Sequence, residues 1–240
     1  MKIKVFDTYE KMSEEAAKIV ASQVILKPDS VIGLATGSTP LGMYGRLAQL
    51  CESGYVDFSE AKTFNLDEYY PIDPKNDQSY RYFMNKNLFD KINIKKENTH
   101  VPDGQTDDPA AFGKEYDKAI GLAGGVDLQV LGIGRNGHIG FNEPGNVLYA
   151  GTHMTDLTAD TIDANSRFFE SADLVPKKAI TMGMGTILKA KMILMLISGK
   201  NKHSALSQLL DDSIVTSNPA TLIKTHENVV VLCDKDAYEG

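Results

Sequence analysis

The sequence predicts an α/β fold: one domain with an open, mostly parallel sheet and helices on both faces, doubly wound in the Rossmann-like manner. Several short segments, among them residues 31–35, 126–133 and 192–198, are mainly apolar and carry almost no charge, as strands buried on both faces do. Segments with apolar residues at helical spacing separate them. With 240 residues, 42% of them hydrophobic, we expect one continuous core spanning residues 1–240.

The first third of the chain predicts strand, helix, strand, helix. Residues 2–6 alternate polar and apolar side chains, as an edge strand does. Residues 31–35 predict a buried strand, and Pro40 favours the first turn of a helix that continues to Gly54. Between the strands predicted at residues 2–6 and 31–35, a helix is expected because apolar residues recur at helical spacing: Met12, Ala16, Ile19, Val20 and Val24.

The remaining segments continue the alternation. Residues 98–109 are polar and predict a loop, and the polar residues 148–164, rich in Thr and Asp, predict a flap over a site. We expect an aromatic helix with Tyr82, Phe83 and Phe89. Further strands are expected at residues 62–66, 126–133, 179–184, 192–198 and 228–233, and further helical segments at 110–122 and 219–225.

Composition argues against several classes of function. The formal charge of -7 and the pI near 5.3 disfavour nucleic acid or an anionic membrane as the main partner. Cys51 and Cys233 lie far apart and suit a reducing compartment, not a disulfide framework. The N-terminus lacks a signal-peptide core, and no apolar run approaches the roughly 20 residues that span a bilayer. We expect a soluble cytoplasmic protein.

Two turns are candidate anion sites. Thr36, Gly37, Ser38 and Thr39 join a strand to a helix; glycine lets the backbone approach an anion, and hydroxyls and helix N–H groups donate to it. The same turn is alternatively a tight turn with a helix cap. It is no nucleotide phosphate loop, because the lysine and spacing of GxxxxGK[ST] are missing. The second candidate, residues 199–202, also precedes a helix.

Two carboxylates, Asp67 and Glu68, follow the strand predicted at residues 62–66. Beside Leu66 and Tyr69, a partly desolvated carboxylate would have a raised pKa and would suit proton transfer. The alternative is that both are ordinary exposed turn residues.

The strand at residues 126–133 ends in a glycine-rich turn that presents Asn136, His138 and Glu143. In open α/β sheets, ligands bind beyond the carboxyl ends of strands, so these residues are site candidates. The turn matches GxGxxG, but the glycines and proline that follow at 140–145 prevent the helix that a dinucleotide site needs. We therefore reject a dinucleotide site.

His138 can take and give a proton at cellular pH, and a carboxylate such as Glu143 on its other nitrogen would fix its tautomer. His138 is alternatively a structural histidine bonded to backbone, or a metal ligand. A metal is disfavoured because the other histidines show no HxxxH or HxH spacing.

Taken together, five motifs resemble those of the glucosamine-6-phosphate deaminase family of amino-sugar catabolism, and the resemblance covers nearly the whole chain. The combination of GHIGFNEP with NLDEY is highly specific, whereas neither glycine loop alone would be. The motifs are TGSTP at 36–40, FNLDEYY at 64–70, GIGRNGHIGFNEP at 132–144, NSRFF at 165–169 and GKNK at 199–202.

The resemblance implies a role for each matching residue. His138, oriented by Glu143, would open the sugar ring; Asp67 would move a proton from C2 to C1; and the imine at C2 would hydrolyse to fructose 6-phosphate and ammonia. No metal, flavin or nicotinamide is expected. The residues implied to hold the sugar phosphate are Thr36, Gly37, Ser38, Thr39, Arg167 and Lys202. Among them, Arg167 and Lys202 would gather positive charge at one place on an acidic chain. Judged alone, Arg167 is a surface arginine.

The chain departs from the family pattern in two places. Many members carry aspartate where Asn136 stands, so Asn136 would assist by hydrogen bonds but cannot be a charged base. Allosteric hexamers of the family carry arginine, lysine and threonine after NEP, plus a longer C-terminal tail, where this chain has His153, Thr155 and Asp156. We expect a monomer or small homo-oligomer, without nucleic-acid or membrane partners and without activation by N-acetylglucosamine 6-phosphate.

Two other functions stay open. A 6-phosphogluconolactonase would share the phosphate platform but would not need Asp67 to remove a carbon-bound proton. A sugar-phosphate sensor domain would be fused to a DNA-binding segment. The acidic composition of the chain, and its opening directly into strand and helix, disfavour this function.

Overall fold

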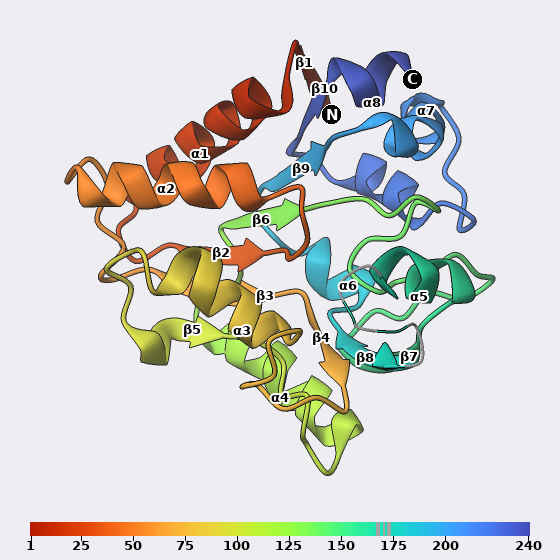
Figure 1. Ribbon diagram of the computed structural model, residues 1–240, viewed down its shortest axis with the longest axis horizontal. Helices are drawn as coiled ribbons and strands as arrows, with labels where there is room; N and C mark the ends of the chain where they lie inside the picture. Colours follow the sequence, from red (N-terminus) through yellow and green to blue (C-terminus); the bar gives the residue numbers. More distant parts are fainter. Residues whose placement is uncertain (167–168, 170, 172–173) are drawn as a thin grey trace.

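Seven parallel strands form the central sheet of the protein (Figure 1). The computed structural model describes residues 1–166, 169, 171 and 174–240. The strands lie in the order β1 (Lys2–Phe6), β10 (Val229–Asp234), β9 (Ile193–Ile197), β6 (Leu128–Leu131), β2 (Val31–Leu34), β3 (Lys62–Asn65) and β5 (Thr99–His100).

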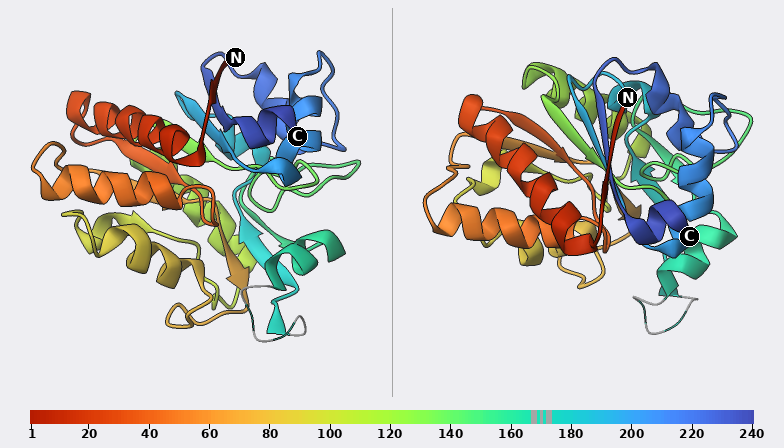
Figure 2. Two further views of the ribbon diagram at one scale, coloured as in Figure 1. Left: turned by 45° about the horizontal axis from the view of Figure 1, so that its top comes forward. Right: turned by 90° about the horizontal axis from the view of Figure 1, so that it is seen from above.

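Helices cover both faces of this sheet, which confirms the predicted doubly wound fold (Figures 1 and 2). One face packs against α1 (Tyr9–Leu26), α2 (Leu41–Glu52), α3 (Tyr80–Met84) and the π-helix η1 (Asn85–Phe89). The other packs against α4 (Pro109–Leu122), α6 (Met184–Ile187), α7 (His203–Leu210), the 3-10 helix η5 (Pro219–Thr225) and α8 (Lys235–Glu239). Among the described residues, no helix is long and apolar enough to cross a membrane.

Local sequence explains where these elements begin. The Thr8 side chain caps α1 by accepting from the Lys11 N–H, and the predicted apolar stripe is buried at Met12, Ala16, Val20 and Val24. The expected edge strand at residues 2–6 is confirmed as β1, which among the described strands pairs with β10 alone.

Three predicted segments differ from the structure. The loop expected at 98–109 contains β5, whose two residues are too few for a recognisable alternation, preceded by the 3-10 helix η2 (Lys96–Asn98). The strand expected at 179–184 ends at Thr181, because Gly183 is the N-cap residue of α6. The helical segment at 219–225 is a 3-10 helix, η5.

A second, antiparallel sheet consists of β4 (Asp67–Tyr70), β8 (Lys178–Thr181) and β7 (His153–Asp156). Leu66 joins it to the main sheet: its N–H donates to the Leu34 carbonyl at 3.0 Å, and its carbonyl accepts from the Met182 N–H at 2.7 Å. Asp67 therefore opens a new strand at the junction of the two sheets and is not part of a turn.

The chain reverses its direction of travel across the sheet between β2 and β6. From β2 it proceeds outward to β3 and β5, and then returns to β6 on the other side of β2. Ligands of doubly wound sheets bind at such a point, beyond the carboxyl ends of the strands. The turns that follow β2 and β6 are those that carry the candidate site residues.

At the opposite, amino ends of the central strands, Asp127 holds three segments together. Its buried carboxylate accepts from the Val31 N–H at 2.8 Å, from Lys27 at 2.6 Å and from Lys191 at 2.8 Å. Burial raises its pKa, but the hydrogen bonds from Lys191, Lys27 and Val31 outweigh burial, so the pKa lies below its ordinary value. The ionised form therefore stabilises the fold.

We expect Asp127→Asn to lower the free energy of unfolding at neutral pH by about 1–3 kcal/mol, because two lysines and a buried N–H lose a charged partner. A carboxylate whose pKa is depressed in the folded state stabilises above its unfolded pKa and stops doing so as the pH falls through its folded pKa. The difference in urea midpoint between variant and wild type should therefore shrink below about pH 4.

Asp7→Asn is the matched control, because Asp7 also pairs with two lysines, Lys11 and Lys235. Those hydrogen bonds lower the pKa of Asp7 to about 2, but Asp7 and both lysines are exposed, so water and salt screen the pairs. Equal losses of stability at the two positions would contradict the importance of burial at Asp127.

Candidate active site

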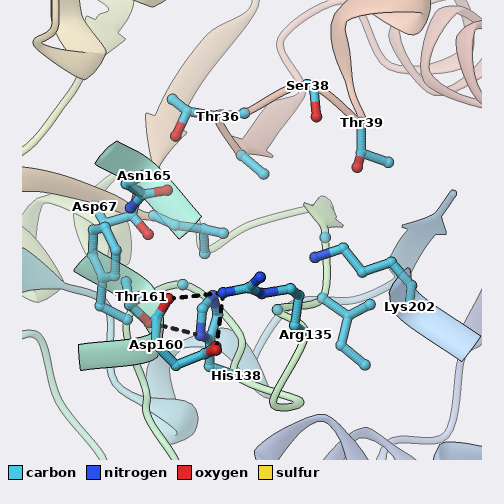
Figure 3. A pocket seen from close by; sticks show the side chains of 18 of the residues that line it. Thr36, Ser38, Thr39, Asp67, Arg135, His138, Asp160, Thr161, Asn165 and Lys202 are labelled. Atoms are coloured by element: carbon cyan, nitrogen blue, oxygen red, sulfur yellow. Dashed lines mark hydrogen bonds and ion pairs between the residues drawn. The ribbon is translucent and has the colours of Figure 1, made fainter. Parts of the chain in front are cut away.

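A pocket of about 480 Å³ lies beyond the carboxyl ends of β2, β6 and β9 and beside the start of β4 (Figure 3). The expected site residues that line it are Thr36, Gly37, Ser38, Thr39, Asp67, His138 and Lys202. Asn136 and Glu143 do not line it but support His138 from behind. Arg167 lies outside the described residues.

The turn at residues 36–39 presents hydroxyl groups to the pocket (Figure 3). Helix α2 has Pro40 as its N-cap residue and no hydrogen bond from a capping side chain. Within the described chain, the hydroxyls of Thr36, Ser38 and Thr39 have no hydrogen-bond partner. The interpretation of this turn as a helix cap is therefore wrong, and three hydroxyls remain to bind a ligand.

Lys202 extends into the pocket from the opposite wall (Figure 3). It ends the 3-10 helix η4 (Lys200–Lys202), which leads directly into α7. The segment from Ser198 to Lys202, here called the Lys202 arm, is held at its start by Asp234, which is buried at the end of β10. The Asp234 carboxylate accepts from the Ser198 hydroxyl and, at 3.1 Å, from the Gly199 N–H. A cation and a set of hydroxyls thus face each other, as a phosphate monoester requires.

Asp67 is buried, with 5% of its surface exposed, and still reaches the pocket. Burial, followed by the charge of Glu68, raises its pKa to about 8. Gly140 lies against it with a φ of 57°; a Cβ there would stand 3.2 Å from Asp67 Oδ2 and 2.8 Å from Thr181 Oγ1. A side chain at position 140 would therefore press on Thr181 and on the Asp67 carboxylate.

Glu68 has 1% of its surface exposed and accepts three backbone hydrogen bonds, from the N–H groups of Tyr69 at 3.0 Å, Tyr80 at 2.8 Å and Arg81 at 2.9 Å. Burial raises its pKa to about 7 against these bonds. It fixes the start of α3, whose Tyr80 lines the pocket. The interpretation of Asp67 and Glu68 as exposed turn residues is wrong for both.

His138 is part of a hydrogen-bonded cluster at the pocket wall. Its Nδ1 lies 3.3 Å from Glu143 Oε2, which also accepts from Asn136 Nδ2 at 2.8 Å, while the Thr161 hydroxyl donates to Glu143 Oε1. Burial raises the pKa of Glu143, but the bonds from His138, Thr161 and Asn136 outweigh burial and hold it below its ordinary value. An ionised carboxylate therefore orients the imidazole.

Within the part of the chain that the structure describes, the hydrogen-bond partners of the His138 ring are side chains, so the alternative of a structural histidine bonded to backbone does not describe it. Nδ1 is occupied, which leaves Nε2 for a ligand. A Cβ on Gly134 would lie 2.5 Å from His138 Cε1, so glycine is needed there for the ring to pack this closely. The described residues contain no cluster of three His, Cys, Asp or Glu side chains that could hold a metal ion.

Sequence reasoning missed several residues of the pocket: Tyr80, Arg135, Asp160, Thr161 and Asn165. The flap expected at 148–164 contains β7 and most of α5 (Ala159–Ser166), and α5 does lie over the site. Arg135 contacts α5 by donating to Asp160 Oδ1 at 2.9 Å and to Asp163 Oδ2 at 3.2 Å. For Asp160 and Thr161 the signal in the sequence was the polarity of this segment, whereas Arg135 and Asn165 stand in the motifs at 132–144 and 165–169.

Comparison with known proteins gives consistent results. Residues 7–232 match a family model described as glucosamine-6-phosphate isomerases/6-phosphogluconolactonase. A glucosamine-6-phosphate deaminase of Halothermothrix orenii is 53% identical over 237 residues, which cover 99% of this chain and 98% of that protein.

Solved structures agree. A monomeric glucosamine-6-phosphate deaminase is 44% identical with a TM-score of 0.97, covering 100% of this chain and 99% of that one. A 6-phosphogluconolactonase from Thermotoga maritima has a TM-score of 0.77 at 24% identity, with 98% and 99% coverage, and shares the fold.

The pocket predicts that inorganic phosphate binds and stabilises the folded state. Phosphate should raise the temperature of thermal unfolding of the wild type, by roughly 2–4 °C for each kcal/mol that bound phosphate adds to the free energy of unfolding. Lys202→Ala should lose most of this shift. Lys200→Ala, in the same turn but outside the pocket, is the control and should keep it. Equal shifts in the two variants would refute the assignment.

Proposed function

Because the chain belongs to the family of glucosamine-6-phosphate isomerases and 6-phosphogluconolactonases, we propose that it converts glucosamine 6-phosphate and water into fructose 6-phosphate and ammonia. This is an enzymatic step of amino-sugar catabolism. One observation carries the proposal: the buried carboxylate of Asp67 faces the same pocket as the His138–Glu143 pair and the hydroxyl-bearing turn at residues 36–39.

In the proposed complex the phosphate lies between the turn at residues 36–39 and Lys202, with Arg167 as a further ligand. Hydroxyls and N–H groups of the turn donate to its oxygens, and Lys202 supplies positive charge. The anchor is remote from the reacting carbons, so it contributes by fixing the sugar relative to the bases.

Ring opening falls to His138. Its Nε2 takes the proton from the O1 hydroxyl and delivers it to O5 as the C1–O5 bond breaks and C1 becomes an aldehyde. Glu143, ionised and hydrogen-bonded to Nδ1, stabilises the imidazolium formed between the two transfers. Asn136 and Thr161 act through Glu143, since both hydrogen-bond its carboxylate.

Isomerisation falls to Asp67. Its carboxylate removes the C2 proton, the electron pair forms the C1–C2 double bond, and O1 gains a proton from water. Asp67 then returns its proton to C1 as the nitrogen gives one proton back to solvent and the C2–N double bond forms. Water adds to C2 of this imine, and expulsion of the nitrogen as ammonia leaves the ketone of fructose 6-phosphate.

Similarity favours deamination over lactone hydrolysis. The deaminases are 53% and 44% identical to this chain, whereas the lactonase from Thermotoga maritima is 24% identical and shares only the fold. Hydrolysis of a lactone needs no base for a carbon-bound proton, and a desolvated Asp67 has no evident use in it. The intact proton-transfer residues likewise favour an enzyme over a sensor domain.

The remaining features of the proposal concern the whole protein. Residues 1–240 form one deaminase/isomerase domain, supported by the family match over residues 7–232. The protein acts as a monomer or small homo-oligomer without activation by N-acetylglucosamine 6-phosphate, supported by the likeness to a monomeric deaminase. A cytoplasmic location suits two free cysteines.

Replacement of the base tests the proposal most directly. Wild-type protein should release ammonia and fructose 6-phosphate from glucosamine 6-phosphate and, in D2O, incorporate deuterium from solvent into the recovered sugar. Asp67→Asn should lose roughly 10²–10⁴-fold in kcat, because proton transfer loses its base. Asp29→Asn, an exposed carboxylate with no partner in the described chain, is the control. Undiminished turnover in Asp67→Asn would exclude this role.

The pH profile should show the raised pKa of Asp67. The base works when ionised, so kcat/KM should rise about tenfold per pH unit up to about pH 8 and then level off. Glu68→Gln removes a neighbouring negative charge, so its rising limb should move to lower pH. The substrate titrates identically in both proteins, so the difference between them reports the enzyme. If Glu68→Gln left the rising limb of the pH profile unmoved, the influence of the Glu68 charge on the pKa of Asp67 would be contradicted.

A further inference from the structure

Tyr9, the first residue of α1, lies behind the turn at residues 36–39 and outside the catalytic pocket. Its hydroxyl accepts a hydrogen bond from the Gly42 N–H at 2.8 Å and lies 3.1 Å from the carbonyl oxygens of both Ser38 and Thr39. One hydroxyl therefore joins α1, the turn and the first turn of α2. No motif in the sequence pointed to Tyr9.

The turn has few other restraints at this point. No side chain caps α2, and the hydrogen bond from the Leu41 N–H to the Ser38 carbonyl is long, at 3.4 Å. The Tyr9 bonds are shorter. They hold the carbonyls of Ser38 and Thr39 on the side of the turn away from the pocket, so the hydroxyls of these two residues remain on the pocket side.

This orientation matters for an anion. A carbonyl oxygen carries partial negative charge, and a peptide that turned its oxygen toward the pocket would repel a phosphate instead of donating to it. Such a rotation of the Ser38–Thr39 peptide would occur about Ser38 ψ and Thr39 φ, the soft dihedrals on either side of it. The hydroxyl of Tyr9 opposes it by donating to the carbonyls from behind.

We propose that Tyr9 is a positioning residue for the phosphate group of the substrate: its hydroxyl locks the turn at residues 36–39 with donors facing the pocket, without touching the substrate. The proposal rests on the proposed function, which makes this turn the phosphate site.

Tyr9→Phe removes only the hydroxyl and keeps the ring in place. We expect KM for glucosamine 6-phosphate to rise about three- to tenfold, the effect of one lost hydrogen bond, with kcat within about twofold of wild type. The inhibition constant of inorganic phosphate should rise by the same factor. Tyr55→Phe, which removes an exposed hydroxyl with no hydrogen bond in the described chain, is the matched control and should change neither constant.

A double-mutant cycle with Ser38→Ala separates action through the turn from a general effect. If Tyr9 acts by presenting Ser38, Tyr9→Phe should raise KM less in the Ser38→Ala background than in wild type. An unchanged KM with a lower melting temperature would make Tyr9 merely structural, and a fall in kcat at constant KM would also overturn the proposal.

The test separates failure of this proposal from failure of the proposed function. If wild type does not turn over glucosamine 6-phosphate, the proposed function fails, yet calorimetric titration with inorganic phosphate still decides the role of Tyr9. Weaker phosphate binding by Tyr9→Phe than by Tyr55→Phe would support it, and equal binding would refute it.

Discussion

The backbone of Leu66 determines how this site is assembled. Its N–H extends the main sheet through Leu34, and its carbonyl accepts from Met182 at the edge of the second sheet. The next residue, Asp67, is thereby held where two sheets of different direction meet, beside the turns that follow β2 and β6. A carboxylate in this junction is shielded from water on most sides, and its raised pKa follows from that position.

The two carboxylates of the reaction have opposite electrostatic environments. Asp67 has a buried neighbour of the same sign, Glu68, whereas Glu143 receives hydrogen bonds from three side chains. The first environment favours the protonated form and the second the ionised form. The proposed reaction needs this difference. Asp67 must keep the proton it takes from C2 until it delivers it to C1, whereas Glu143 must stay ionised behind the imidazole.

The sequence was sufficient for the fold class and for most strands, because apolar runs and helical spacing are local properties. It was also sufficient for the turn at residues 36–39 and for His138 with Glu143, since each motif is short and contiguous. Local composition suggested a partly desolvated carboxylate at Asp67 but could not decide against an exposed turn, because the cover of this strand comes from α3 and β8. Thr161 and Arg135 meet the site through α5, and such long-range contacts leave no periodic signal.

The pairing of the first strand with the last has a consequence for biosynthesis. Among the strands that the structure describes, β1 pairs with β10 alone, so the first strand has no sheet partner until β10 has been synthesised. Asp234, which secures the arm bearing Lys202, belongs to that same strand. Pairing of β1 and anchoring of the Lys202 arm by Asp234 therefore both require β10, and a polypeptide cut before this strand has neither.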